Sequence, residues 1–241
     1  MKTLGLIGGI APESTVDYYR RLVAACRERD GDPPIVINSI DLTKMLALAA
    51  NDRPALTTYL VAEVERLARA GADFGAFASN TPHLVFDEVQ RAASIPLVSI
   101  VDCARDAAVA RRLRRLALLG TRFTMTGTFY PTLFAASGIV LVTPADDEQT
   151  WVHDTYMTDL VAGRFEAATQ QRFLRLIEEL QTREQIDGVI LAGTELPLLL
   201  RDATVAGVEM LDTTALHVAA LVERMTGRST IEVEFQHSAG G

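Results

Sequence analysis

Two stretches have the same pattern of residues: Leu4-Gly5-Leu6-Ile7-Gly8-Gly9 at the start of the chain, and Leu116-Ala117-Leu118-Leu119-Gly120-Thr121 near its middle. Each is a short apolar run that ends in small residues and is followed by an amphipathic stretch. This pattern is typical of a buried parallel β-strand that turns into a helix. Because it opens both halves of the 241-residue chain, the sequence predicts two α/β lobes of similar construction.

Short apolar runs alternate with longer amphipathic runs along the chain, as in βαβ units. We expect strands at residues 3–8, 34–39, 73–78, 95–100, 115–120, 138–143, 187–192 and 207–211. We expect helices at residues 13–29, 52–71, 84–93, 101–112, 124–136, 147–162, 165–183 and 213–226. The predicted fold class is α/β, with two pseudo-symmetric lobes that each contain a parallel sheet flanked by helices.

The predicted lobes divide the chain near residue 100. The N-terminal lobe covers residues 1–98 and is completed by helix 213–226, and the C-terminal lobe covers residues 99–212. Residues 228–241 are expected to form a tail or an edge strand, because their first part alternates apolar and polar residues. Ligands of open α/β sheets bind beyond the carboxyl ends of the strands, so we expect the active site between the lobes.

Composition and charge narrow the classes of function. The hydrophobic fraction of 49% supports a sizeable core, and the net charge of −8 disfavours nucleic acid or an anionic membrane as a partner. No apolar run reaches the roughly 18 residues of a membrane span, and the N-terminus lacks the apolar core of a signal peptide, so we expect a cytoplasmic protein. Cys26 and Cys103 belong to no CxxC or Cys/His cluster, which argues against a disulfide framework and a structural zinc site.

The first candidate site is Ser79-Asn80-Thr81, which follows the predicted strand 73–78. The side chains of Asn80 and Thr81 can hydrogen-bond a carboxylate or a carbonyl group of a ligand. His83, two residues further on, is a candidate base. The competing interpretation is structural, with Asn80 or Thr81 capping a helix.

The counterpart in the second half is Gly193-Thr194-Glu195, which follows the predicted strand 187–192. Glu195 is a candidate general acid or base, or a partner for an ammonium group, and Thr194 is a candidate substrate-binding residue. The competing interpretation places Glu195 in the first turn of a helix, where the helix dipole favours a carboxylate.

Four further residues are candidates for substrate binding. Gly9 lies in a glycine turn before a helix, where a ligand can approach the backbone, although a tight turn is the alternative. Thr121 and Thr124 follow the first strand of the second half and suit a carboxylate, with helix capping as the alternative. Arg53 is a candidate clamp for a carboxylate, with an ordinary surface arginine as the alternative.

Together these motifs resemble the aspartate/glutamate racemase family, the cofactor-independent amino-acid racemases, from about residue 4 to residue 226. The segments that carry the resemblance are 5–12, 79–83, 119–130 and 191–196. The resemblance implies two pseudo-symmetric lobes, a site between them, a small carboxylate substrate, no cofactor, no metal and a homodimer.

That family typically has a cysteine at the first position of both tripeptides, and the two thiols exchange the α-proton on opposite faces of the substrate. The matching positions here are Ser79, whose hydroxyl is a far weaker acid than a thiol, and Gly193, which has no side chain. Some members also bind the substrate carboxylate with a lysine just before a glycine in the second half. The matching stretch 161–163 has no basic residue, and Arg164 is the nearest candidate replacement.

Three functions follow from this comparison. The first is a racemase-like isomerase that moves a proton at the α-carbon of a small amino or dicarboxylic acid, with unusual acid and base groups. The second is one-sided chemistry on the same scaffold, namely a lyase, decarboxylase or double-bond isomerase that uses Ser79, His83 or Glu195. The third is a protein that binds a small carboxylate without turning it over.

Overall fold

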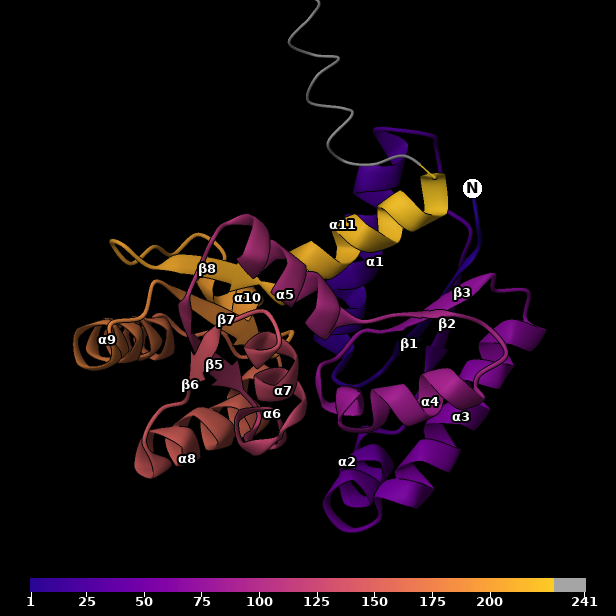
Figure 1. The fold of residues 1–241 in the computed structure, drawn as a ribbon. Coiled ribbons are helices and arrows are strands. Elements are labelled where there is room, and N and C mark those ends of the chain that lie inside the picture. The colour runs from indigo at the N-terminus through magenta and orange to yellow at the C-terminus, as the bar shows by residue number, and fades with distance from the viewer. Residues whose placement is uncertain (228–241) are drawn as a thin grey trace, which may run out of the picture.

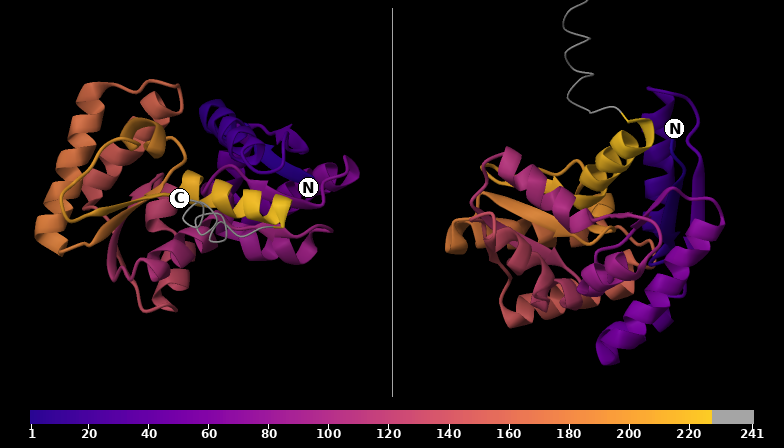
Figure 2. Two further views of the ribbon diagram at one scale, coloured as in Figure 1. Left: turned by 90° about the horizontal axis from the view of Figure 1, so that it is seen from above. Right: turned by 45° about the vertical axis from the view of Figure 1, so that its right-hand side comes forward.

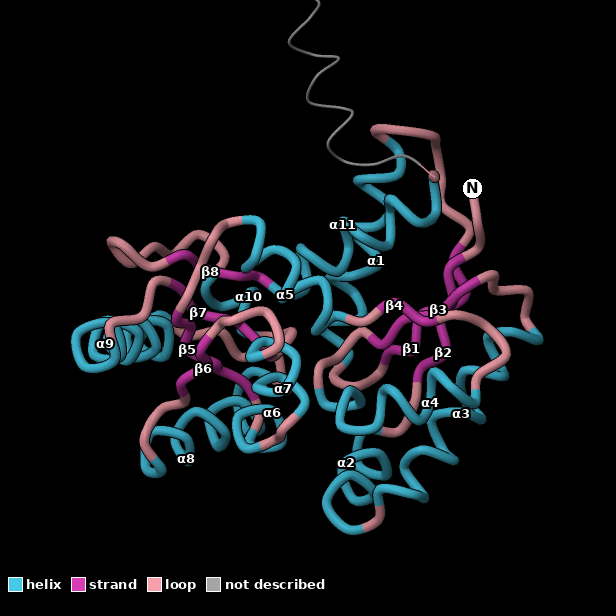
Figure 3. The backbone as a smooth tube through the Cα atoms, viewed as in Figure 1, coloured by secondary structure: helices cyan, strands magenta, loops and turns pink. Residues whose placement is uncertain are grey.

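The computed structural model describes residues 1–227 and contains two four-stranded β-sheets (Figure 1). Their strand orders are β2-β1-β3-β4 and β6-β5-β7-β8, and all strand pairings within both sheets are parallel. Helices lie on both sides of the sheets (Figure 3). This arrangement confirms the predicted α/β fold with two lobes, while the predicted tail or edge strand at 228–241 lies outside the described residues.

The predicted strands are all present, with ends that differ by up to two residues. They are β1 (Leu4–Gly8), β2 (Ile35–Ser39), β3 (Phe74–Phe77), β4 (Leu97–Val98), β5 (Arg115–Gly120), β6 (Val140–Val142), β7 (Gly188–Ala192) and β8 (Glu209–Asp212). The two apolar runs that open the halves form β1 and β5, which are inner strands with almost every residue buried. Burial on both faces explains why these runs contain no polar residue at alternate positions.

The helices differ from the sequence prediction at several places. The α-helices are α1 (Pro12–Arg27), α2 (Leu42–Asn51), α3 (Arg53–Arg69), α4 (Phe86–Ala92), α5 (Ile100–Ala110), α6 (Arg122–Thr126), α7 (Phe129–Ala135), α8 (Asp146–Thr155), α9 (Ala167–Glu184), α10 (Leu196–Leu200) and α11 (Thr213–Thr226). A 3₁₀-helix, η1 (Thr81–Val85), precedes α4, and a π-helix, η2 (Tyr156–Leu160), continues α8. In residues 1–227 none of the helices is both long enough and apolar enough to cross a membrane.

Two helices, α2 and α10, were not predicted from the sequence, and the single helix predicted at 124–136 was wrong. Helix caps and a local break in the chain explain α2 and the predicted helix. Asp41 caps α2 by accepting a hydrogen bond from the backbone N–H of Lys44, and Asp52 ends α2 and caps α3. The short helix α10 was also missed. The single helix predicted at 124–136 is two helices, because the chain is extended at Gly127.

The last helix, α11, leaves the C-terminal sheet after β8 and packs against α1 of the N-terminal lobe (Figures 1 and 2). In this interface the Tyr18 hydroxyl donates to His217 Nδ1 at 2.9 Å, and His217 Nε2 donates to the carbonyl of Val98 at 3.1 Å. Burial lowers the pKa of His217 to about 4, so the ring is neutral and can accept at one nitrogen while it donates at the other.

Ion pairs near this interface also join the two lobes. Asp17 on α1 accepts from Arg201, which follows α10, at 2.9 Å. Arg21 on α1 binds Asp17 at 2.8 Å and Asp212 at 3.0 Å. Because Asp212 also caps α11, these contacts fix the start of the crossing helix relative to α1.

We expect Tyr18→Phe to lower the free energy of unfolding by about 1–3 kcal/mol, because it leaves the buried Nδ1 of His217 without a donor. Urea denaturation at pH 7 measures this loss. Tyr19→Phe is the matched control, since Tyr19 is 49% exposed, and it should change stability by less than about 0.5 kcal/mol. Equal stability of the two variants would show that the Tyr18 bond does not stabilise the lobe interface.

Candidate active site

A small cavity of about 20 Å³ lies between the lobes, at the carboxyl ends of the inner strands. The N-terminal lobe contributes Ile10, Ala11, Leu42, Leu46, Ser79 and Thr81, and the C-terminal lobe contributes Thr121, Tyr156, Met157, Val161 and Glu195. Parallel pairing of β1 with β3 and of β5 with β7 brings the segments that follow these strands to one place. The cavity has room for about one water molecule, so lining side chains have to move when a larger ligand enters.

Three threonine hydroxyls join the two lobes beside this cavity. The Oγ1 atoms of Thr81 and Thr121 are 3.4 Å apart, and those of Thr121 and Thr124 are 3.3 Å apart. Thr81 and Thr121 line the cavity, whereas Thr124 is fully buried behind Thr121. The two lining hydroxyls are neutral groups that can donate to a carboxylate. Thr121 precedes α6, but its side chain makes no capping bond, so the capping alternative is wrong for this residue.

Asn80 is buried next to Thr81 in the chain, and its side chain makes one hydrogen bond. Its Oδ1 accepts a 2.7 Å hydrogen bond from the Tyr130 hydroxyl, which fixes the orientation of the amide. Its Nδ2 is buried and has no partner within residues 1–227. An unpaired buried donor of this kind costs about 1–3 kcal/mol, so a ligand or water that accepts from it is favoured. The Asn80 side chain does not cap η1.

Glu195 lines the cavity and is only 1% exposed. Its Oε2 accepts hydrogen bonds from the hydroxyls of Tyr156 and Thr194, the second at 3.1 Å. Its Oε1 has no partner among the described residues. Burial raises the pKa of Glu195 above its usual value, although the hydroxyls of Tyr156, Ser14 and Thr194 counteract part of that rise. A carboxyl group with a raised pKa and a free oxygen is suited to general acid and base work.

The space beside Gly193 is filled by the ring of Tyr156. A Cβ atom built on Gly193 would lie 2.9 Å from Cζ and 3.0 Å from the hydroxyl oxygen of Tyr156, which is closer than real contacts allow. Burial raises the pKa of Tyr156 well above its usual value, so the phenol stays protonated and donates to Glu195. Tyr156 therefore takes the position that a side chain at residue 193 would occupy.

Sequence reasoning missed Tyr156, which lies inside the helix predicted at 147–162. The residue begins η2, and single π turns of this kind are frequent at functional sites. A π turn gives no strong signal in the sequence. The glycine at position 193 was the only hint, because it leaves room that some other group has to fill.

Gly9 has a backbone conformation that is set by its turn. Its φ is 77°, in the region that favours glycine, and an added Cβ would lie 2.7 Å from the carbonyl oxygen of Ile40. Its N–H donates to Thr15 Oγ1 at 2.9 Å. The glycine is thus explained by the tight turn before α1, and Gly9 is not among the residues that line the cavity.

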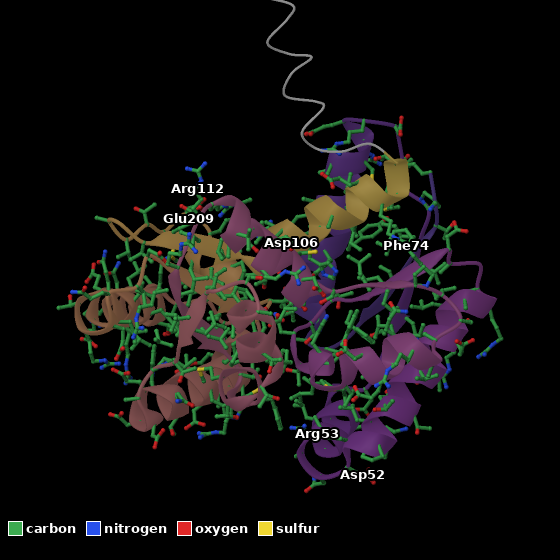
Figure 4. The ribbon with its side chains drawn as sticks, in the orientation of Figure 1. Asp52, Arg53, Phe74, Asp106, Arg112 and Glu209 are labelled. Atoms are coloured by element: carbon green, nitrogen blue, oxygen red, sulfur yellow. The ribbon has the colours of Figure 1, made fainter. Side chains whose placement is uncertain are left out.

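His83 and Arg53 are not among the residues that line the interlobe cavity, and both line a separate cleft of about 370 Å³. His83 Nε2 accepts from the N–H of Ile100 at 3.3 Å, and burial lowers the pKa of His83 to about 3. Figure 4 shows Arg53 beside Asp52 at the start of α3, at the edge of the N-terminal lobe. The predictions that His83 is a base and Arg53 a clamp in the interlobe cavity are therefore not supported by the geometry.

The cysteines are also remote from the cavity lining. Cys26 is buried in the core between α1 and α11. Burial raises the pKa of Cys103 to about 12, with Asp102 and Asp106 adding to the rise, so this thiol is not ionised near neutral pH. Within residues 1–227 there is no group of three His, Cys, Asp or Glu side chains placed to hold a metal ion.

The fold and this geometry define a two-lobed α/β protein with a buried, partly polar site at the strand ends between the lobes. The chain belongs to the Asp/Glu/Hydantoin racemase family, whose model matches residues 7–221. This assignment confirms the resemblance that the sequence motifs indicated.

Three relatives illustrate the family. An aspartate racemase homologue from Pyrococcus horikoshii is 36% identical, with a TM-score of 0.79 over 94% of this chain and 100% of that one. Picrophilus torridus aspartate racemase is 20% identical and shares the fold, with a TM-score of 0.74 over 94% and 95% of the two chains. The broad specificity amino-acid racemase RacX of Bacillus subtilis is 24% identical over 144 residues, which cover 56% of this chain and 61% of that protein.

We expect Gly193→Ala to destabilise the protein by about 1–3 kcal/mol, because the added methyl group forces the ring of Tyr156 to move. In a Tyr156→Ala background the ring is absent, and the same change at residue 193 should cost little. Urea denaturation of the parent, both single variants and the double variant gives the coupling energy of this pair. Additive losses would contradict the contact.

Proposed function

We propose that the chain is a racemase-type isomerase that moves a proton at the α-carbon of a small amino acid held between the lobes. The observation that carries this proposal is the buried carboxyl group of Glu195, which lines the interlobe cavity with one oxygen unpaired and with a raised pKa. Ser79, from the other lobe, lines the same cavity. Proton transfer at a carbon atom needs such a group within reach of the reacting bond.

Binding would use the neutral donors of the site. The substrate carboxylate accepts from Asn80 Nδ2, which has no other partner, and from the hydroxyls of Thr81 and Thr121. These donors also stabilise the negative charge that spreads onto the carboxylate when the α-proton leaves. An ammonium group on the substrate is attracted by the ionised Glu195.

In the proposed reaction, a residue of each lobe acts on one face of the α-carbon. Glu195 removes the α-proton through Oε1 while Tyr156 and Thr194 keep their hydrogen bonds to Oε2. A proton then reaches the opposite face from the Ser79 hydroxyl, and the configuration is inverted. Ser79 regains a proton from water, and Glu195 gives its proton to the hydroxide that remains, which restores both groups. The C-terminal side of the site thus uses a carboxyl group and a phenol instead of a side chain at residue 193.

The relatives support racemisation over the other candidate reactions. One is a broad specificity amino-acid racemase, and another is an aspartate racemase. A homodimer in the cytoplasm that needs no cofactor, as the family resemblance implies, remains part of this proposal.

We expect Glu195→Gln to reduce α-proton exchange by about a hundredfold or more, because the amide cannot accept the proton. Exchange into D₂O is followed by NMR with a panel of amino acids, and optical rotation reports inversion. Glu178→Gln, on the exposed face of α9, is the matched control and should keep the parent rate. Full exchange by Glu195→Gln would remove Glu195 from the mechanism, whereas exchange by the parent without inversion would favour one-sided chemistry.

Tyr156→Phe keeps the ring against Gly193 but removes the hydroxyl that lowers the pKa of Glu195. The pKa of Glu195 should then rise further above its usual value. Because the base must be ionised, the rise of exchange rate with pH should occur at higher pH in this variant than in the parent. A pH–rate profile measures the shift, with Tyr19→Phe as the control, and coincident profiles would exclude the proposed role of the Tyr156 hydroxyl.

A further inference from the structure

The cavity lining contains acidic, hydroxyl and apolar groups but no positive side chain among the described residues. From this we infer that the substrate is a small amino acid whose side chain is uncharged and apolar, and that dicarboxylic amino acids are poor substrates. The inference rests on the proposed function, since it concerns the same site. It goes beyond that function because it states which amino acids the site accepts.

The apolar part of the lining comes from both lobes. Leu42 and Leu46 lie one helical turn apart on α2 and therefore share a face of that helix. Met157 and Val161 are spaced in the same way along and just beyond η2. An apolar substrate side chain would lose contact with water against these four residues, which is favourable. The flexible thioether of Met157 can adapt to side chains of different shape.

The polar part of the lining is sufficient for one carboxylate only. The hydroxyls of Thr81 and Thr121 in the lining are neutral donors, and so is the buried amide of Asn80 next to Thr81 in the chain. Under the proposed function the α-carboxylate accepts from these three groups. A second carboxylate would be buried without a partner of opposite charge, which is strongly unfavourable. It would also lie in the same small cavity as the carboxyl group of Glu195, and like charges at short range repel.

The cations near the lining are engaged elsewhere. Arg164, three residues after Val161, binds Asp159 at 2.8 Å and also donates to the carbonyl of Thr158. The prediction that Arg164 replaces a substrate-binding lysine is therefore not supported. Lys44, between Leu42 and Leu46 on α2, points to a different face, where its ammonium group lies 4.4 Å from the centre of the Tyr59 ring.

The more distant arginines lie in other places as well. Arg53 lines the separate cleft of about 370 Å³ rather than the interlobe cavity. Arg201 is bound to Asp17 at 2.9 Å in the ion pairs between α1 and α10. Moving Arg201 to the cavity would break its ion pair with Asp17.

Three substrates of nearly the same shape test this inference. L-Leucine, L-asparagine and L-aspartate have side chains with the same number and branching of non-hydrogen atoms. Their terminal atoms differ in polarity and charge, and Cγ is tetrahedral in leucine but planar in the other two. Isothermal titration calorimetry with the full-length protein measures binding, and α-proton exchange in D₂O measures turnover. We expect leucine to bind at least about tenfold more tightly than aspartate, with asparagine between them.

A variant with an added positive charge gives the complementary result. Val161 is partly exposed and lines the cavity, so Val161→Lys adds an ammonium group without filling the core. This variant should bind aspartate more tightly than the parent and leucine more weakly. Val161→Met adds length without charge and should keep the parent order of preference, with its melting temperature reporting correct folding.

The outcomes separate this inference from the proposed function. Tighter binding of aspartate than of leucine by the parent protein would overturn the inference. If the parent also exchanged the α-proton of aspartate, the proposed function would still stand. Preferential binding of leucine without any exchange would support the inference and contradict the proposed function. Failure to bind any of the three amino acids would overturn the inference.

Discussion

The packing of the Tyr156 ring on the bare backbone of Gly193 is the contact on which the chemistry of the site depends. No side chain fits at residue 193 while the ring is there, and the ring holds its hydroxyl against Glu195. Family members with a thiol at this position place a reactive group on the strand end itself. In this chain a π turn in another segment places the Tyr156 hydroxyl against Glu195. Under the proposed function this packed group takes the place of a side chain at residue 193.

The fold keeps that pair aligned with the opposite lobe through contacts remote from the cavity. The crossing helix α11 is fixed to α1 by the hydrogen bond from Tyr18 to the neutral His217, and the Asp17 ion pairs lie alongside. The threonine hydroxyls of the two lobes meet at 3.4 Å beside the cavity. These interactions restrict how the lobes can separate. Because the cavity has a volume of only about 20 Å³, a ligand must displace side chains to enter.

Electrostatics in the site are set by burial more than by neighbouring ions. Burial raises the pKa of Glu195 and of Tyr156, and the hydrogen bond between them lets the phenol stabilise the ionised carboxylate. Among the described residues the lining adds only neutral hydroxyl donors to this pair, so it offers hydrogen bonds but no positive charge to a negative group.

The sequence by itself determined the two α/β lobes, because buried parallel strands need continuous apolar runs and those runs are visible at β1, β3, β5 and β7. It also identified Ser79, Thr81, Thr121 and Glu195, since ligands bind beyond the ends of such strands. Only the tertiary structure decided that Tyr156 fills the space at Gly193 and that His83 and Arg53 line another cleft. It also showed that, within residues 1–227, the cavity lining has no cationic side chain. These features depend on contacts between side chains from segments that are distant in the sequence. Local patterns of polarity do not specify such contacts.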